Sequence, residues 1–439
     1  MTALKLAVVG AGPSAFYTVS RILSSLPAAS ARDVQVHMYD RVPAPHGLVR
    51  YGVAPDHPEV KNCINKFDQT AQDPRFSFFG NVLVDPTSTS SDQYPNAVPL
   101  PLTSLFPHYT HLLFAQGASQ PLLLPMLPQA VAALSLVHWY TGHPAAPSTP
   151  PIPIDTIQHL TLIGHGNVSL DIARLLLRAP ASLEQYNDLP RPVLHHLEKS
   201  TVKHVTIVGR RAPAQVSFTA KELRELMSLP DVSFEPIDSA LLNTARTDDR
   251  LDRPKKRILD ILSTGSKAKF GSTDKAWSLR FLRSPLEWHP GKKQLKLGQN
   301  SLTAHGQAEA TGDEELFGTD SVVVSVGYRS EPSPGLKAWF DQTTGRIRNS
   351  NGRVMDSFGR VVQNVYASGW AATGARGVIA ASMHSAYMTA DNLLADLQAP
   401  VAEAVLSPLA TDPLCGVPSP LHAAMGQVAG YDDWRTRAL

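Results

Sequence analysis

The sequence predicts an α/β protein in which one βαβ domain is inserted into another. Two glycine-rich loops, Gly10–Ala15 and Gly164–Ser169, each follow a candidate strand and precede a candidate helix, which is typical of βαβ units. A last candidate strand and an alanine-rich helix occupy residues 364–397. The 439 residues are enough for two or three domains. The expected domains are a first domain in two parts, 1–116 and 328–439, and an inserted domain, 117–327.

Composition narrows the class of function. Forty Lys and Arg residues against 38 Asp and Glu residues give a formal charge of +2, which does not favour a nucleic-acid-binding protein. The two cysteines, Cys63 and Cys415, are too far apart in sequence for a CxxC redox pair and too few for a zinc or iron–sulfur site. We therefore expect no metal site, and any redox chemistry must use a bound organic cofactor.

No targeting or membrane-spanning segment is expected. A candidate strand at Lys5–Val9 begins almost at once, so we expect neither a signal peptide nor a transit peptide. The most apolar region, Pro121–Tyr140, is interrupted by Pro125 and Pro128. A spanning helix needs about 20 apolar residues, so this region is predicted to be buried. Peripheral membrane association stays open.

The first glycine loop has the features of a Rossmann-like dinucleotide site. Gly10 permits the tight turn, Gly12 lets the backbone approach a pyrophosphate, and the small Ala15 allows close packing of helix on strand. The helix N-terminus adds amide donors and a positive dipole. The next candidate strand ends at Asp40, whose carboxylate can bind ribose hydroxyls. This loop predicts a site for FAD or NAD.

The second glycine loop predicts a different dinucleotide. Gly164, Gly166 and Ser169 repeat the pattern, but the following strand ends in Arg210 and Arg211 in place of an acid. Guanidinium groups at that position suit the 2′-phosphate of NADP through bidentate contacts. The alternative is that both arginines are solvated surface charges. Two dinucleotides in one chain imply hydride transfer between them, and the cofactors carry that chemistry.

Several segments resemble the adrenodoxin reductase family, which comprises NADPH–ferredoxin reductases of glutathione-reductase-like fold. The resemblance covers residues 5–395, and the segment GLVRYGVAPDHPEVKN is far more specific than either glycine loop. The resembling segments are Val8–Tyr17, Gly47–Asn62, Gly164–Ala173, Val208–Arg211, Phe218–Glu225, Arg280–Pro285 and Ser368–Ile379.

The resemblance implies two Rossmann-like domains, with the NADP domain inserted into the FAD domain. It implies that NADPH gives a hydride to FAD and that reduced FAD passes single electrons to an adrenodoxin-like [2Fe–2S] ferredoxin. Eukaryotic members are mitochondrial, so it also implies a mitochondrial location. The implied FAD contacts are Ser14, Asp40, Leu48, Val84, Trp370, Gly377, Val378 and Ile379. The implied NADPH contacts are His165, Gly166, Asn167, Val168, Arg210, Arg211, Glu222 and Gly377.

The chain departs from the family pattern at three places. The family has Glu where Asp40 stands and Gln where His165 stands. After Trp370 it reads Val-Lys-Arg-Gly-Pro-Thr-Gly, whereas this chain has Ala371–Gly377, including Arg376. Arg376 lies beside the expected flavin and nicotinamide region.

Two residues are candidates for a catalytic role. His57 in the PDHPEVK loop is either a proton or hydrogen-bond partner near the flavin or an imidazole that structures the loop. The resemblance pairs Asp171 with His57, and the alternative is an ordinary acid in the first turns of a helix.

A set of basic residues is the candidate surface for the partner protein. These residues either dock an acidic ferredoxin or form a solvated face. The set is Arg224, Arg253, Lys255, Lys256 and Arg257. Two other functions stay in view: an NADPH-dependent reductase serving another acceptor such as a quinone, and a dinucleotide-binding sensor without turnover.

Overall fold

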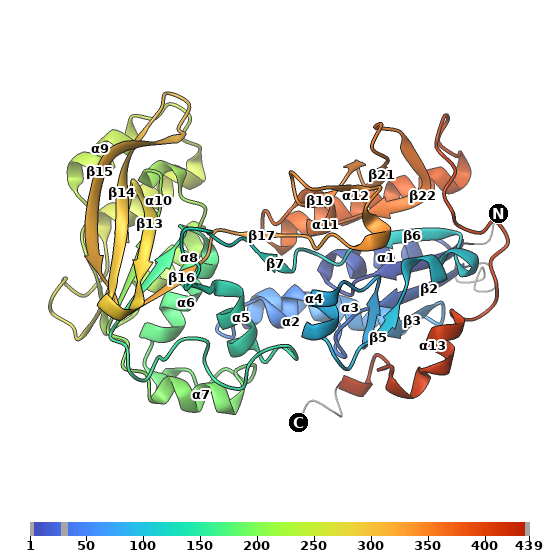
Figure 1. The fold of residues 1–439 in the computed structure, drawn as a ribbon, viewed down its shortest axis with the longest axis horizontal. Coiled ribbons are helices and arrows are strands. Elements are labelled where there is room, and N and C mark those ends of the chain that lie inside the picture. Colours follow the sequence, from blue (N-terminus) through green and yellow to red (C-terminus); the bar gives the residue numbers. More distant parts are fainter. Residues whose placement is uncertain (1–3, 28–33, 435–439) are drawn as a thin grey trace. The chain divides into compact units, whose positions relative to one another are not determined.

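The computed structural model describes residues 4–27 and 34–434, and the chain divides into two compact units. The first unit comprises residues 1–53, 57–120 and 328–439. The second comprises residues 54–56 and 121–327, so its sequence interrupts that of the first. Each unit contains a largely parallel sheet with helices, and the predicted α/β class is therefore confirmed (Figure 1).

The first unit is built on a seven-stranded sheet with the order β20-β21-β22-β6-β1-β2-β3. Five neighbouring strands, from β22 to β3, are parallel, and β20 and β21 add an antiparallel edge. All six residues of β1 are buried, and five of them are apolar, the exception being Lys5. The strands are β1 (Leu4–Val9), β2 (Val34–Tyr39), β3 (Phe76–Phe79), β6 (His111–Phe114), β20 (Asn349–Ser350), β21 (Arg353–Met355) and β22 (Val361–Ala367).

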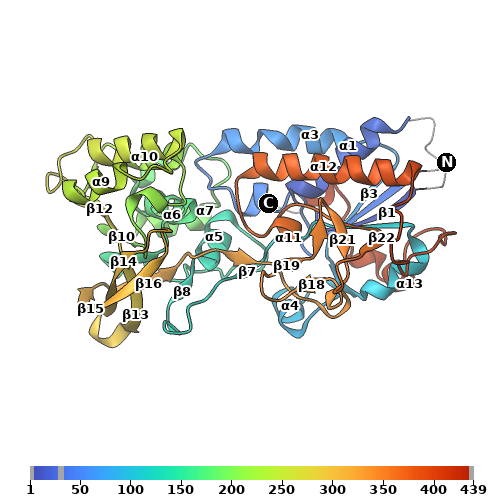
Figure 2. The same ribbon diagram turned by 90° about the horizontal axis from the view of Figure 1, so that it is seen from above.

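Helices α1 (Pro13–Ser25) and α12 (Ile379–Gln398) pack against each other in the first unit, with α3 (Ile64–Ala71) beside α1 (Figure 2). Ala386 and Ala390 of α12 are fully buried, and these small side chains allow the helices to approach closely. The smaller elements are α2 (Leu48–Tyr51), β4 (Val82–Val84), α4 (Ser88–Gln93), β5 (Val98–Leu100), β17 (Tyr328–Arg329), β18 (Phe340–Asp341), β19 (Arg346–Ile347), α11 (Trp370–Thr373) and α13 (Ser419–Ala423).

The second unit contains a six-stranded parallel sheet with the order β11-β12-β10-β9-β16-β8. Its strands are β8 (Val131–Ala132), β9 (His159–Ile163), β10 (His204–Val208), β11 (Val232–Phe234), β12 (Lys275–Arg280) and β16 (Ser321–Val324). Its helices are α5 (Ala133–Thr141), α6 (Asn167–Leu177), α7 (Arg191–Glu198), α8 (Ala220–Met227), α9 (Ser239–Arg246) and α10 (Arg253–Thr264). An antiparallel sheet of β13 (Arg283–His289), β14 (Gln294–Leu302) and β15 (Ala308–Gly318) lies along one side of the unit (Figure 1).

One expectation about a buried segment needs correction. The region Pro121–Tyr140 is buried mainly in its second half, on α5, whereas Leu122, Leu123 and Met126 are 38, 65 and 48% exposed. No described helix combines the length and the apolar composition that crossing a membrane requires.

Residues 76–84 form two strands, β3 and β4, because Asn81 between them adopts a positive φ of 59°.

Candidate functional site

The first glycine loop connects β1 to α1 in the first unit. Gly10 has a φ of +100°, and an added Cβ would lie 2.6 Å from the carbonyl oxygen of Ala115, so only glycine fits there. Gly12 is the N-cap of α1, and an added Cβ would meet no heavy atom within 4 Å. The fully buried Ala15 packs into the core of the unit. The loop therefore leaves open space in front of the N-terminus of α1.

Asp40 follows β2 and turns its carboxylate toward this loop. It accepts hydrogen bonds from the backbone amides of Ala11 at 2.6 Å and Val42 at 3.1 Å. Burial raises the pKa of the Asp40 carboxyl, and these two hydrogen bonds oppose that rise. A carboxylate offers about four acceptor sites, so two amides leave capacity for ligand hydroxyls.

Residues 46–48 lie directly on the first glycine loop. The amide of His46 donates to the carbonyl of Ala11 at 2.8 Å. An added Cβ at Gly47 would lie 2.9 Å from the Cα of Gly12, so the two backbones are in close contact. Leu48 begins α2 and is half-buried. Val84, also half-buried, ends β4 in the same unit.

The turn after β22 meets the N-terminus of α1. The hydroxyl groups of Ser14 and Ser368 are 2.6 Å apart and buried. An added Cβ on Gly369, which has a φ of +61°, would lie 2.5 Å from the Cβ of Ser14. These contacts bring residues 354 positions apart in sequence to one point of the first unit.

Trp370 and the start of α12 follow this turn. The indole of Trp370 stacks on Tyr328 with ring centroids 6.3 Å apart, and its Nε1 donates to the carbonyl of Arg376 at 3.2 Å. Gly377 has a φ of +80°, and Val378 is the N-cap of α12 with 53% of its surface exposed. Ile379 is the first residue of the helix. The segment 371–376, which departs from the family pattern, thus has its last carbonyl hydrogen-bonded to the Trp370 side chain.

The second glycine loop connects β9 to α6 in the second unit. An added Cβ at Gly164, where φ is +129°, would lie 2.2 Å from the carbonyl oxygen of Ser325. Gly166 is the N-cap of α6 and, like Gly12, has no heavy atom within 4 Å of an added Cβ. Asn167 accepts a hydrogen bond from the amide of Thr219 at 2.8 Å, which fixes the side chain beside the half-buried Val168.

His165 fills the middle of this loop as a neutral imidazole. Its Nε2 lies 3.1 Å from the carbonyl oxygen of Ile207, and its ring contacts Phe281 at a centroid distance of 4.7 Å. Burial lowers the pKa of His165 to about 4. Because a carbonyl only accepts, the proton lies on Nε2 at neutral pH.

Arg210 and Arg211 follow β10 at the same edge of the parallel sheet. Arg210 is exposed and Arg211 is half-buried. The side chain of Asn300 donates to the carbonyl of Arg210 at 3.2 Å, and the amide of Leu282 donates to that of Arg211 at 3.2 Å. Within residues 4–27 and 34–434, neither guanidinium group has a carboxylate partner. Both charges are therefore available to an anionic ligand.

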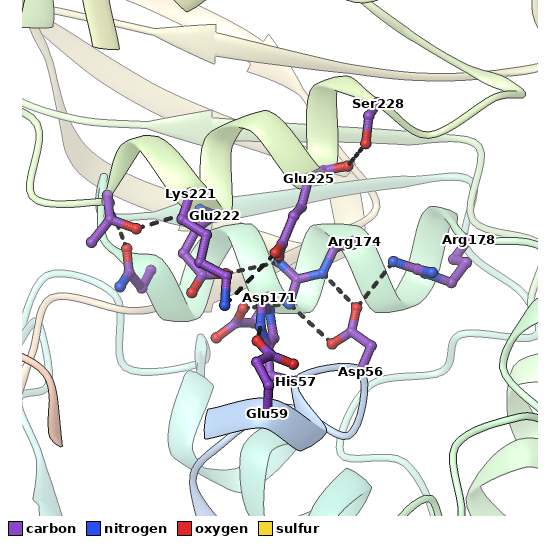
Figure 3. A network of polar contacts seen from close by, with 12 residues as sticks. Asp56, His57, Glu59, Asp171, Arg174, Arg178, Lys221, Glu222, Glu225 and Ser228 are labelled. Carbon is purple, nitrogen blue, oxygen red and sulfur yellow. Dashed lines mark hydrogen bonds and ion pairs between the residues drawn. The ribbon is translucent and has the colours of Figure 1, made fainter. Parts of the chain in front are cut away.

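A buried cluster of charges lies on α6 and α8 of the second unit (Figure 3). The side chain of Arg174 is fully buried. It donates to both oxygens of Asp56 at 2.5 and 3.0 Å and to Asp171 at 2.7 Å. It also contacts Glu222 at 3.1 Å and Glu225 at 3.8 Å. Four carboxylates thus converge on one guanidinium group, and the segment 54–56 is held in the second unit.

The cluster explains the protonation and the placement of its members. Burial alone would lower the pKa of Arg174. The hydrogen bond to Asp56 and the charges of Asp171 and Glu222 outweigh burial, so the pKa of Arg174 is raised above its usual value. Sequence reasoning missed both Arg174 and Asp56. The signal was a lone arginine within the apolar helix sequence DIARLLL, since buried arginines are rare unless paired.

The two expected catalytic residues lie in different units. Asp171 belongs to the cluster on α6 in the second unit. His57 belongs to the first unit, is 3% exposed, and has its Nδ1 3.3 Å from Glu59.

The expected basic surface lies on α8 and α10. Arg224, Arg253, Lys256 and Arg257 are exposed, and none of them has an ion-pair partner in the described part of the chain. Lys255 differs, because its ammonium group is half-buried and donates to the carbonyl of Val216. The structure therefore corrects the expectation that Lys255 belongs to this exposed set.

The described residues fit two dinucleotides of different charge. The space in front of Gly12 and Gly166 would admit a pyrophosphate to two helix N-termini. In the first unit, Asp40 follows β2, the strand next to β1. In the second unit, Arg210 and Arg211 follow β10, the strand next to β9, and neither has a carboxylate partner among the described residues. The first arrangement suits ribose hydroxyls, and the second suits an additional phosphate.

Comparisons with known proteins give the family. No family model matches the chain. Human mitochondrial NADPH:adrenodoxin oxidoreductase is 38% identical over 419 residues, which cover 90% of this chain and 79% of that protein. NADPH-ferredoxin reductase FprA of Mycobacterium tuberculosis is 35% identical over 409 residues, covering 89 and 84%. The structure of FprA in complex with NADPH matches with a TM-score of 0.80 at 32% identity, covering 98 and 92% of the two chains. The chain therefore belongs to the family of NADPH:adrenodoxin oxidoreductase and NADPH-ferredoxin reductase FprA.

Proposed function

We propose that the protein is an FAD-dependent NADPH:ferredoxin reductase of the adrenodoxin reductase type. The observation that carries this proposal is the difference between the two glycine loops. One is followed by the acidic Asp40, and the other by Arg210 and Arg211, which have no carboxylate partner in the described residues. FAD, when bound, takes a hydride from NADPH and releases electrons singly to a ferredoxin.

The first unit holds FAD through backbone and carboxylate contacts. Gly10 and Gly12 shape the loop, and the N-terminus of α1 at Ser14 supplies amide donors to the pyrophosphate. Asp40 uses its remaining acceptor sites for ribose hydroxyls. Further FAD contacts are assigned to Leu48, Val84, Trp370, Gly377, Val378 and Ile379, in agreement with the family resemblance.

The second unit holds NADPH. Gly166 and the N-terminus of α6 bind its pyrophosphate, with His165, Asn167 and Val168 lining the loop. Arg210 and Arg211 bind the 2′-phosphate. Glu222, oriented by the buried Arg174, would contact NADPH, as the family resemblance implies. These roles account for the neutral His165 and for the two guanidinium groups, which have no carboxylate partner among the described residues.

His57 and Asp171 are assigned to the transfer step. His57 is a hydrogen-bond partner for the flavin side, with Glu59 orienting its Nδ1. Asp171 is held in one orientation by Arg174 at 2.7 Å. Hydride transfer itself moves no proton to the protein, so neither residue needs to act as an acid in that step.

The partner is an acidic ferredoxin with a [2Fe–2S] cluster. Arg224, Arg253 and Arg257 are exposed on neighbouring helices of the second unit, and no carboxylate of the described chain neutralises them. Complementary charges of this kind raise the rate of encounter with an acidic partner.

A mitochondrial location is proposed from the names of the mitochondrial relatives. The mycobacterial relative is 35% identical and the human mitochondrial relative is 38% identical, so sequence identity alone does not separate a mitochondrial from a bacterial origin. Fractionation of the source cells, followed by immunoblotting against a mitochondrial matrix marker, tests the location. Recovery in the cytosolic fraction would contradict it.

Stopped-flow absorbance of the purified yellow protein tests the function. We expect bleaching of the flavin by NADPH under anaerobic conditions, followed by recovery when an acidic [2Fe–2S] ferredoxin is added. Turnover with ferricyanide or a quinone but with no ferredoxin would show that the acceptor is different. A folded protein that binds no FAD would refute the proposal.

A further inference from the structure

The C-terminal segment of the described chain crosses the loop that lies on the first glycine loop. Here the C-terminal clasp is residues 429–434, and the flavin loop is residues 46–51. Both belong to the first unit. The clasp begins with two hydrogen bonds between Gly80 and Ala429, at 2.8 and 3.0 Å, in an antiparallel bridge. A turn closed by Gly430 and Asp433 at 2.8 Å then directs the chain over the flavin loop.

The flavin loop adopts a backbone conformation that needs support. His46 has a φ of +86° and is fully buried. L-residues with bulky side chains rarely adopt a positive φ, and such residues persist only where surrounding contacts hold them. The amide of His46 bonds to Ala11, and the backbone of Gly47 lies on Gly12. A shift of His46 would therefore change the glycine loop itself.

Tyr431 of the clasp holds the side chain of His46. Its hydroxyl donates to Asp68 at 2.7 Å and lies 2.8 Å from Nε2 of His46. Because a hydroxyl has only one proton, Nε2 of His46 is the donor in the second contact. The ring of Tyr431 packs edge-on against Phe16 and Phe78, with centroids 6.1 and 6.0 Å away. The imidazole is thus fixed by a tyrosine that is anchored on both sides.

Trp434 holds the other end of the flavin loop. The guanidinium of Arg50 lies 3.8 Å from the centroid of the Trp434 ring, a close cation–π contact. The same indole contacts His46 edge-on at 6.1 Å. Arg50 also donates to the carbonyl of Pro45 at 3.2 Å. The clasp therefore contacts the loop on both sides of Gly47.

We propose that the C-terminal clasp is a positioning element for FAD, and that Tyr431 and Trp434 are its positioning residues. They hold His46 and Gly47 against Gly12, and so fix the pyrophosphate-binding backbone without touching the cofactor. This inference rests on the proposed function, because it assigns FAD to the first glycine loop. It predicts that the C-terminal residues control how long FAD stays bound.

The test measures FAD release from four variants. Tyr431→Phe removes one hydroxyl, Trp434→Leu removes the cation–π contact, and the double variant removes both. Tyr366→Phe is the matched control, because this buried tyrosine of the same unit also bonds to an aspartate, Asp396, at 3.0 Å. FAD fluorescence, which increases on release, follows dissociation after dilution. We expect release to be about tenfold faster in each single clasp variant and within about twofold of wild type in the control.

Hydrogen exchange of the FAD-free protein gives an independent measurement. Amides of residues 46–51 should exchange faster in Tyr431→Phe than in Tyr366→Phe, whereas the amides of β1 stay equally protected in both. Clasp variants that release FAD no faster than the control, or that leave exchange at 46–51 unchanged, would overturn the inference. A wild-type protein that binds no FAD would instead refute the proposed function.

Discussion

Arg174 donates two hydrogen bonds to the carboxylate of Asp56, at 2.5 and 3.0 Å, and the two residues are 118 positions apart in sequence. Both side chains are buried, with 0 and 3% of their surface exposed. The contact holds residues 54–56 in the second unit, although the residues on either side belong to the first. A two-hydrogen-bond contact to a buried arginine is a strong anchor.

Replacing Arg174 should destabilise the second unit strongly. Arg174→Met leaves Asp56 and three other carboxylates without their shared cation, and breaking a buried pair costs about 3–5 kcal/mol. Urea denaturation measures the loss. Arg21→Met is the control, because its pair with Asp391 is 48 and 52% exposed and solvent screens such a surface pair, so the loss should be much smaller. Equal losses in the two variants would contradict the role of the buried cluster.

Arg210 and Arg211 should determine the preference for NADPH. A charge-assisted contact to phosphate is worth about 1.5–3 kcal/mol before allowance for exposure. The Arg210→Gln/Arg211→Gln variant should therefore raise KM for NADPH by about 10- to 100-fold and change KM for NADH little. Arg246→Gln, on an exposed ion pair of the same unit, is the control. An equal rise for both nucleotides would mean that the arginines do not bind the 2′-phosphate.

Stability should fall as the pH decreases from about 6.5 to 4. Burial lowers the pKa of His165 to about 4, and those of His37, His111 and His159 to about 4 as well. The unfolded chain binds protons at these histidines before the folded protein does, so their contribution is complete above pH 6.5 and is lost toward pH 4. Urea midpoints across this range should show the decline, and His165→Gln should make it shallower. An unchanged slope in that variant would refute the assignment for His165.

His57 should affect electron transfer more than folding. Hydride donation needs no acid, so we expect His57→Gln to keep its FAD and to slow flavin reduction by less than about tenfold, well below the usual effect of losing a general acid or base. Single-turnover reduction by NADPH and the FAD content of the purified variant are the measurements. Loss of FAD would show that the imidazole structures the loop instead.

Reduction of ferredoxin should be sensitive to salt. Exposed charges attract over about 10 Å at 0.1 M salt. Arg253→Glu/Arg257→Glu should raise KM for ferredoxin and flatten its dependence on ionic strength, because both arginines are exposed on α10. Ferricyanide reduction, which needs no docking surface, is the control and should not change. A variant that serves ferredoxin as well as wild type would show that the docking surface lies elsewhere.

The sequence alone determined the α/β class and the two glycine loops. Each loop is a local pattern, in which Gly10 or Gly164 must have a positive φ. The residue after the next strand then indicates which dinucleotide binds. Such features depend on backbone conformation within a few residues, so they can be predicted without knowing what packs around them. The family resemblance added the candidate contacts outside these loops.

Only the tertiary structure decided which distant residues meet. Asp56 with Arg174, and His46 with Tyr431, are 118 and 385 positions apart, and neither pair follows a sequence pattern. The antiparallel strands β13–β15 were also missed, because β15 is exposed along nearly all of its length and shows no alternation of apolar and polar residues. Contacts between distant residues depend on how the whole chain folds and packs its core. A local pattern in one sequence does not contain that information, so these contacts become visible only in the tertiary structure.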